Sequence, residues 1–216
     1  MVGVAGLRDL HKRRRRAAIL AAARDALRSV PADKLTVEDI AARAEVAPAT
    51  VYNLIGPRES LYAALLDDLL DQLDDRLDTM GRLPPLERAL AVVDTSVDLF
   101  VADPDVWRPV VTRLTPGLRH QPARLQVDAL EQARTAGLLR ADADTTALGT
   151  QVLVAYTGAL FSWAGGELTA AGFRVLAHRG LDVVVASAAV EEDVRAAALA
   201  RIAHDPTPAP ATWEDP

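Results

Sequence analysis

The segment from Thr36 to Tyr62 constrains the fold of this chain most strongly, because it predicts two short helices joined by a tight turn and followed by a third helix. Thr36 suits a helix N-cap, since its hydroxyl accepts from an amide of the first turn. The apolar residues that follow recur at helical spacing and define one inward-facing stripe. They are Val37, Ile40, Ala41 and Ala44. After a short turn, Pro48 has no amide hydrogen to leave unpaired and suits the first turn of a second helix.

The second helix of this pair is predicted to present a small, smooth and mostly uncharged outer face. Val51 and Leu54 form its buried side. The outer face comprises Pro48, Ala49, Thr50, Tyr52 and Asn53. Such a face fits the major groove of DNA. Gly56 and Pro57 end the helix, and Arg58 begins a longer one whose free amides suit a phosphate group.

This segment resembles the helix-turn-helix of the TetR (tetracycline-repressor) family of transcriptional regulators. The matching positions are Ala41, Ala44, Val46, Thr50, Tyr52 and Arg58. The resemblance implies that Tyr52 and Arg58 contact DNA phosphates and that Thr50 and its neighbours lie in the groove. It also implies a larger helical domain that binds a small ligand, and a dimer.

Three positions depart from the family motif. Glu45 stands where the family usually has glycine, so a positive φ there would cost about 1 kcal/mol. Ala47 replaces the usual serine and offers no side-chain oxygen to cap the second helix, a loss of about 1 kcal/mol. Residues 53–55 replace a common histidine and aromatic. Asn53 is either a reader of an adenine edge or a solvated polar residue.

A first helix is predicted before this pair, because apolar residues from Ile19 to Val30 recur at helical spacing. Three helices then share one small core. A basic cluster, Lys12 to Arg16, precedes the apolar face. It either follows the DNA backbone or enters a minor groove as a flexible arm, and the alternative is a solvated, disordered terminus. The predicted DNA-contacting residues are Thr36, Pro48, Ala49, Thr50, Tyr52, Asn53, Arg58, Lys12, Arg13 and Arg14.

Charge is distributed unevenly along the chain. Residues 1–58 hold 11 Lys and Arg against 6 Asp and Glu, whereas residues 59–216 hold 13 against 24. A basic head on an acidic body is expected when only the head approaches a polyanion, and the alternative is an uneven surface without such a partner. The absence of cysteine excludes disulfide frameworks and thiolate zinc sites, and it fits a reducing cytoplasm.

The predicted fold is all-α, with an N-terminal helix-turn-helix DNA-binding domain at 1–60, a helical ligand-binding and dimerisation domain at 61–205, and a disordered tail at 206–216. Leucines from Leu61 to Leu77 recur at helical spacing, so one long helix links the head to the body. Six aspartates on this helix are expected to form its solvated face instead of a cation site. The apolar run at 152–164 is too short to cross a membrane.

Two late segments, about 145–164 and 169–190, are unusually apolar and rich in small residues. Small residues let helices approach closely, and such a pair is expected to form a four-helix seam with a second copy. The predicted dimer interface comprises Gly149, Gly158, Ser162, Gly172 and Gly180. The alternative is a monomer that buries both helices internally.

A ligand cavity is expected inside the body, mostly apolar with a few polar groups. Its candidate lining residues are Asp94, Asp98, Phe100, Trp107, Arg113, Gln151 and Tyr156. For each of them, core packing or a surface salt bridge is the competing interpretation. Asp94 and Asp98 lie four residues apart on one helix face. If both point inward they favour a cationic ligand, because a buried carboxylate pair without a positive partner is costly.

These features predict a cytoplasmic, ligand-responsive transcriptional regulator, a repressor that binds a near-palindromic double-stranded DNA operator as a homodimer and is released by a small molecule. The alternative is a helical interaction module of the same fold that has lost autonomous DNA binding, which Glu45 and Ala47 would allow. Catalysis, a metal and a cofactor are not expected, because the four histidines lack metal-ligand spacing and no phosphate loop or nucleophile elbow occurs.

Overall fold

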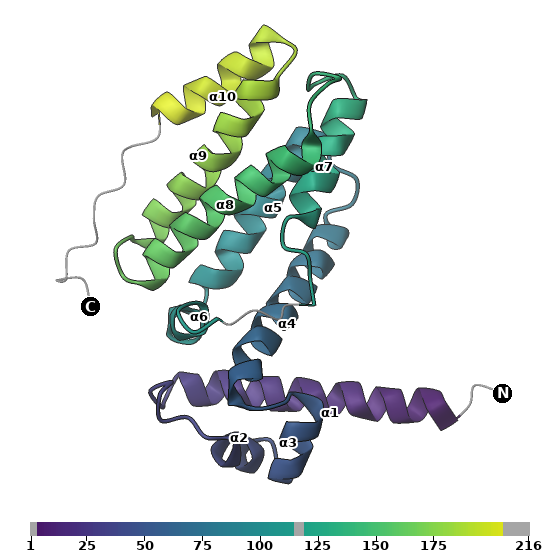
Figure 1. Cartoon of the computed structure of the whole chain (residues 1–216), viewed down its shortest axis with the longest axis vertical. Coiled ribbons are helices and arrows are strands. Elements are labelled where there is room, and N and C mark those ends of the chain that lie inside the picture. The colour runs from purple at the N-terminus through teal and green to yellow at the C-terminus, as the bar shows by residue number, and fades with distance from the viewer. Residues whose placement is uncertain (1–3, 115–118, 205–216) are drawn as a thin grey trace. The chain divides into compact units, whose positions relative to one another are not determined.

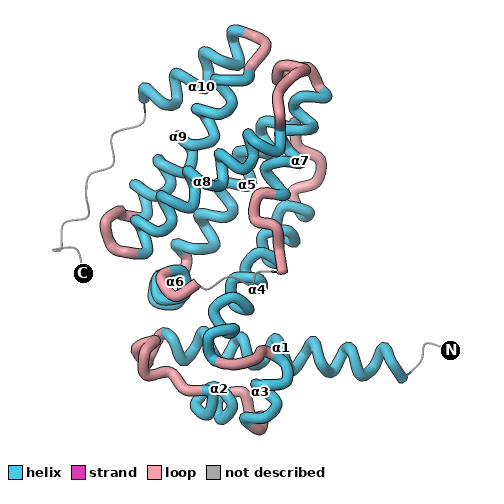
Figure 2. Tube along the Cα trace, in the orientation of Figure 1, coloured by secondary structure: helices cyan, strands magenta, loops and turns pink. Residues whose placement is uncertain are grey.

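The computed structural model describes residues 4–114 and 119–204, and these ranges are helical almost throughout (Figure 2). They contain ten α-helices, and their only β-type pairing is one isolated bridge between Leu139 and Ala189. The predicted all-α fold is therefore confirmed. The predicted tail at 206–216 lies outside the described residues.

The chain divides into two compact units. The head unit comprises Met1–Asp68 and Asp105–Arg119, and the body unit comprises Leu69–Pro104 and His120–Pro216. The helix α4 (Arg58–Thr79) contributes residues to both units. The segment Asp105–Arg119 therefore groups with the head, a relationship that helical periodicity does not reveal.

The head unit consists of α1 (Val4–Leu27), α2 (Val37–Arg43), α3 (Pro48–Leu54), the first turns of α4, and nearly all of α6 (Pro104–Val111). Apolar residues at helical spacing supply its core, and burying them drives the helices together. The most deeply buried include Ile19, Leu35, Ile40, Val51 and Leu61, each at most 2% exposed.

The N-terminal half of α1 extends beyond α2 and α3 (Figure 1). From Asp9 to Ala18 every side chain is exposed except Arg16, which is half-buried. The interpretation of Lys12 to Arg16 as a flexible arm or disordered terminus is therefore wrong, since these residues are helical. The physical reason is composition: no Gly or Pro lies between residues 7 and 30, and Ala, Arg and Leu are strong helix formers.

The body unit consists of the rest of α4 with α5 (Pro85–Val101), α7 (Arg124–Thr135), α8 (Thr145–Ala164), α9 (Ala170–Ala188) and α10 (Glu192–His204). The helices α8 and α9 pack together, and α10 folds back beside α9 (Figure 1). Trp163 and Phe173 are its largest fully buried side chains. Within the described ranges, no helix combines the length and the apolar character needed to cross a membrane.

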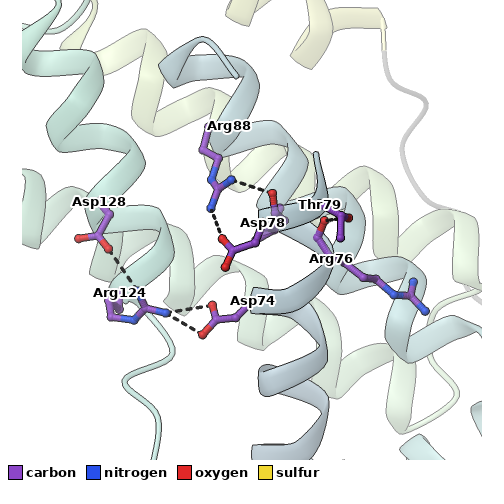
Figure 3. A network of polar contacts seen from close by, with 8 residues as sticks. Asp74, Arg76, Asp78, Thr79, Arg88, Arg124 and Asp128 are labelled. Carbon is purple, nitrogen blue, oxygen red and sulfur yellow. Dashed lines mark hydrogen bonds and ion pairs between the residues drawn. The ribbon is translucent and has the colours of Figure 1, made fainter. Parts of the chain in front are cut away.

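An ion pair and a side-chain hydrogen bond attach the C-terminal half of α4 to its neighbours in the body unit (Figure 3). Arg124 on α7 donates to both carboxylate oxygens of Asp74 at 2.9 and 2.8 Å. Arg88 on α5 donates to the carbonyl of Leu77 at 3.0 Å. A bidentate guanidinium–carboxylate pair is geometrically specific, so these contacts define the orientation of α4 within the body unit.

The sequence predicts that the aspartates of α4 form a solvated face, but two of them make specific contacts with other segments. Asp67 is only 3% exposed, and Arg119 donates to it from within the head unit. Asp68 accepts from Arg24 of α1 at 2.7 Å. The prediction fails because the partners of these carboxylates lie on segments distant in sequence.

Candidate nucleic-acid interface

The start of α2 is capped as the sequence predicted. The hydroxyl of Thr36 accepts from the amide of Asp39 at 3.1 Å, and the carboxylate of Asp39 accepts from the amide of Thr36 at 3.2 Å. This reciprocal capping box satisfies two amides that the helix itself leaves unpaired. Thr36 remains exposed, although its hydroxyl is engaged by Asp39.

The turn between α2 and α3 requires a left-handed residue, and Glu45 supplies it with φ of 53°. The amide of Val46 donates across this turn to the carbonyl of Ala41 at 3.0 Å. The positive φ considered for Glu45 is therefore confirmed, and a side chain in this conformation is strained. At the next helix start, Ala47 makes no side-chain cap, also as predicted. The helix-turn-helix forms despite both departures.

The outer face of α3 is exposed. Pro48, Ala49 and Asn53 are exposed, and Tyr52 is 50% exposed. The predicted groove residue Thr50 is half-buried. Val51, at 1% exposure, holds the other side of the helix in the core. The structure therefore presents a nearly uncharged surface, while contact of these side chains with DNA stays a prediction.

Arg16 anchors the end of α3 to α1, a role that periodicity alone does not signal. Its Nη1 donates to the carbonyl of Leu54 at 3.0 Å. The helix ends at Leu54, and two residues later Gly56 has a φ of 108°, a conformation that favours glycine. The basic side chains Lys12, Arg13 and Arg14 remain exposed on α1, beyond this anchor.

Arg58 has a structural contact that sequence reasoning missed. Its guanidinium donates to the carbonyl of Ala32, and the hydroxyl of Tyr62 donates to the same oxygen at 3.3 Å. Both side chains therefore attach the start of α4 to the loop after α1. A guanidinium carries five N–H donors, so this contact leaves donors for the predicted phosphate.

The residues predicted to line a ligand cavity are divided between the two units. Trp107 is buried and Arg113 is exposed in the head unit, whereas the remaining five belong to the body unit. Gln151 is exposed on α8. Arg113 donates to the carbonyl of Pro109. Because Gln151 and Arg113 are exposed, neither side chain faces an enclosed cavity within its own unit.

The carboxylates Asp94 and Asp98 have a positive partner within the chain. Arg174 on α9 donates to Asp94 at 3.0 Å and also to Asp98. The hydrogen bond to Asp98 raises the pKa of Arg174. The Nε2 of His178 lies 2.8 Å from Asp94. The condition for a cationic ligand, a buried carboxylate pair without a positive partner, is therefore not met, because Arg174 contacts both carboxylates and Asp98 is exposed.

Phe100 and Tyr156 belong to an aromatic cluster in the body unit. Phe100 lies edge-on to Trp163 with ring centroids 6.5 Å apart, and Trp163 stacks on Phe173 at 5.6 Å. Tyr156 lies 5.4 Å from Phe173. The hydroxyls of Tyr156 and Ser96 lie 2.6 Å apart, and burial raises the pKa of Tyr156. Core packing thus accounts for both predicted residues.

Two glycines predicted at a dimer interface allow close packing between helices of the same chain. A Cβ at Gly149 would lie 2.5 Å from the Cγ2 of Val127 on α7, and a Cβ at Gly180 would lie 2.6 Å from that of Ala155 on α8. These contacts explain both glycines within one chain, and their place at a dimer interface stays a prediction. Gly172 is likewise buried, and its amide donates to the N-cap Thr169 at 3.0 Å.

An exposed apolar face nevertheless remains on α8 and α9. It comprises Val154, Gly158 and Phe161 on α8 and Val183 on α9, and we call it the α8/α9 face. Val154 is 58% exposed and Phe161 46% exposed. No described atom would lie within 4 Å of a Cβ at Gly158. The predicted interface residue Ser162 is half-buried beside it.

The chain has a helix-turn-helix unit with exposed basic residues on α1, and a second, helical unit follows it. This combination is typical of helix-turn-helix DNA-binding regulators. Residues 19–65 match the family model described as bacterial regulatory proteins of the tetR family. The head therefore carries the N-terminal domain of this family, and the chain as a whole resembles its TetR-family neighbours in fold. A comparison with curated proteins finds no match to this sequence.

Several solved structures share this fold at low sequence identity. FadR of Thermus thermophilus, a TetR-family transcriptional repressor in complex with lauroyl-CoA, is 19% identical with a TM-score of 0.62, covering 82% of this chain and 96% of its own. CprB of S. coelicolor A3(2) is 19% identical with a TM-score of 0.57, and the match covers 88% of this chain and 96% of CprB. SmeT, the repressor of a Stenotrophomonas maltophilia multidrug efflux pump, is 21% identical with a TM-score of 0.55, and the match covers 83% of this chain and 92% of SmeT.

Proposed function

We propose that this protein is a cytoplasmic transcriptional repressor that binds a near-palindromic DNA operator as a homodimer and is released by a small molecule. The observation that carries this proposal is the exposed, nearly uncharged face of α3, from Pro48 to Asn53. An α-helix of this kind fits between the walls of a major groove, where base edges are read. The exposed Lys12, Arg13 and Arg14 on α1 supply positive charge for the phosphate backbone.

The α8/α9 face supports the homodimer. Its exposed valines and phenylalanine would be removed from water by a second copy, which is favourable by about 25 cal/mol per Å² of apolar surface. A twofold interface places the same face on both protomers. Two α3 helices would then enter successive major grooves about 34–36 Å apart on one face of the duplex.

Release by a small molecule would require a difference in affinity between two states of the dimer. A ligand bound in the body would favour a state in which the two heads are wrongly spaced, and α4 would transmit this change to the heads. A coupling free energy of about 1–3 kcal/mol between the ligand and DNA sites would change DNA affinity roughly 5- to 150-fold. The fold similarity to a repressor solved with lauroyl-CoA and to an efflux-pump repressor supports both the ligand and the repressive direction.

Selection of genomic fragments by the purified protein tests this function. We expect retention of a small set of fragments that share an inverted repeat, with affinity that falls steeply as salt rises. Tyr52→Phe should weaken specific binding roughly 5- to 10-fold, because it removes a hydroxyl predicted to contact a phosphate. Small molecules that release the retained fragments then identify the effector class.

A matched pair of charge variants separates local contacts from general electrostatics. Arg13→Ala should reduce the slope of log affinity against log salt by about 0.9 if Arg13 neutralises one phosphate. Arg82→Ala makes the same charge change at an exposed position in the body unit and should leave that slope unchanged. Retention of no specific fragment would contradict the proposal and favour an interaction module of the same fold.

A further inference from the structure

A groove of about 350 Å³ lies among α5, α9 and α10 of the body unit. Its walls are mainly apolar and include Leu86, Leu90, Leu181, Val185 and Val194. This volume falls within the range of small-molecule sites, about 300–1,000 Å³. It involves the N-terminal half of α5 and is built by residues other than the aromatic cluster around Trp163.

One buried carboxylate in this groove is only half satisfied. Asp182 on α9 is 1% exposed, and its Oδ1 accepts from both Nε and Nη2 of Arg201 on α10, at 2.9 and 2.5 Å. Its Oδ2 is buried and has no hydrogen-bond partner among the described residues. A guanidinium commonly serves both oxygens of a carboxylate, whereas here both donors converge on one.

The unsatisfied oxygen points to a missing donor. Buried polar atoms are nearly always hydrogen-bonded in folded proteins, because an unpaired one has lost its water without compensation. Two further carboxylates, Glu87 and Asp193, also line the groove, and Arg201 is the one cation among the lining residues. The groove therefore carries a net negative charge over an apolar surface.

We propose that this groove binds a lipophilic primary amine. Its ammonium would donate to Oδ2 of Asp182 after displacing the side chains that bury this atom, while Arg201 keeps Oδ1. Its alkyl part would cover the leucines and valines. An ammonium group can donate a hydrogen bond to the unpaired Oδ2 and also neutralise part of the net negative charge of the groove. A carboxylate ligand can do neither. Such an amine would act as an effector only if the proposed function holds, but the binding site does not depend on it.

Isothermal titration of the full chain with three probes of equal chain length, each below its micelle-forming concentration, tests this site without DNA. Decylammonium should bind with one molecule per chain. Decyltrimethylammonium keeps the charge but has no N–H donor, so it should bind at least tenfold more weakly. Decanoate should show no binding. Absence of decylammonium binding, or equal binding of decanoate, would overturn the proposal.

Two variants and a control connect binding to the groove. Asp182→Asn should weaken decylammonium binding at least tenfold, whereas Glu191→Gln makes the same charge change at an exposed position outside the groove lining and should have no effect. Ala197→Phe fills the groove and keeps the Asp182–Arg201 pair, so it should abolish binding even if Asp182→Asn does not fold. Undiminished binding by Ala197→Phe would refute the site and leave the proposed DNA-binding function intact.

Discussion

The backbone amide and the Nε of Arg119 donate to the two carboxylate oxygens of Asp67, at 3.0 and 3.1 Å. Asp67 lies on α4 and is 3% exposed, whereas Arg119 follows α6 by several residues. This pairing attaches the end of the Asp105–Arg119 segment to α4 within the head unit. The segment after α6 and the helix that follows the helix-turn-helix are therefore parts of one compact structure.

Replacing Asp67 by asparagine should lower the free energy of unfolding by about 1–3 kcal/mol, because the amide NH₂ cannot accept from Arg119 and the charge is lost. Urea denaturation of the purified variant measures the change. Asp75→Asn is the matched control, since Asp75 is exposed on the same helix and should alter stability by less than about 0.5 kcal/mol. Equal losses in both variants would mean that the Asp67 contact contributes nothing specific.

Glycine at position 45 should raise stability by about 0.5–1 kcal/mol. Glu45 has a φ of 53°, which glycine adopts without strain, although its greater freedom in the unfolded chain offsets part of the gain. Ala42→Gly, at an exposed position within α2, should instead lower stability by about 1 kcal/mol. Thermal and urea unfolding of both variants check the opposite signs, and a loss in Glu45→Gly would show that the strain is compensated elsewhere.

Alanine at position 149 should destabilise the body unit by about 1–3 kcal/mol, because its Cβ would lie 3.0 Å from the backbone nitrogen of Val127. Gly158→Ala is the control on the same helix, where no described atom of the same chain lies within 4 Å of the added Cβ. Because Gly158 belongs to the α8/α9 face, the two variants are compared in the monomeric state. There the higher helix propensity of alanine should add about 0.5–1 kcal/mol. Both are compared by urea denaturation at one protein concentration. A tolerated Gly149→Ala would contradict close packing of α7 against α8.

Stability should fall at alkaline pH partly through Tyr156. Burial raises the pKa of this phenol above its ordinary value of 10.0, so the unfolded chain releases the proton first. The stabilisation is therefore complete below about pH 10 and is lost as pH rises above that value. Tyr156→Phe should flatten this alkaline decline and cost about 1 kcal/mol at neutral pH through loss of the Ser96 contact.

Ser96→Ala provides the control for Tyr156→Phe. It removes the same 2.6 Å hydrogen bond but keeps the buried phenol, so the alkaline decline should persist while neutral stability falls. Unfolding free energies measured at a series of pH values distinguish the two variants. If both variants decline identically above pH 10, another group dominates the alkaline transition.

Local features of the head followed from the sequence, because each depends on residues only a few positions apart. Thr36 and Asp39 form the capping box, Pro48 begins α3, and Val51 faces the core while Tyr52 faces outward. Glu45 adopts the strained conformation that the missing glycine implied. Helical periodicity and capping chemistry operate within a single turn or two, so they can be deduced without knowledge of the tertiary fold.

Tertiary structure alone decided which distant residues became partners. Helical spacing cannot specify that Arg174 neutralises Asp94, that Arg58 donates to Ala32, or that Asp67 is buried. Glycine-rich composition likewise signals close packing without saying whether the neighbour is Val127 of the same chain or a second copy. The physical reason is that charge pairing and steric fit depend on positions in space, and residues far apart in sequence acquire those positions only when the helices pack.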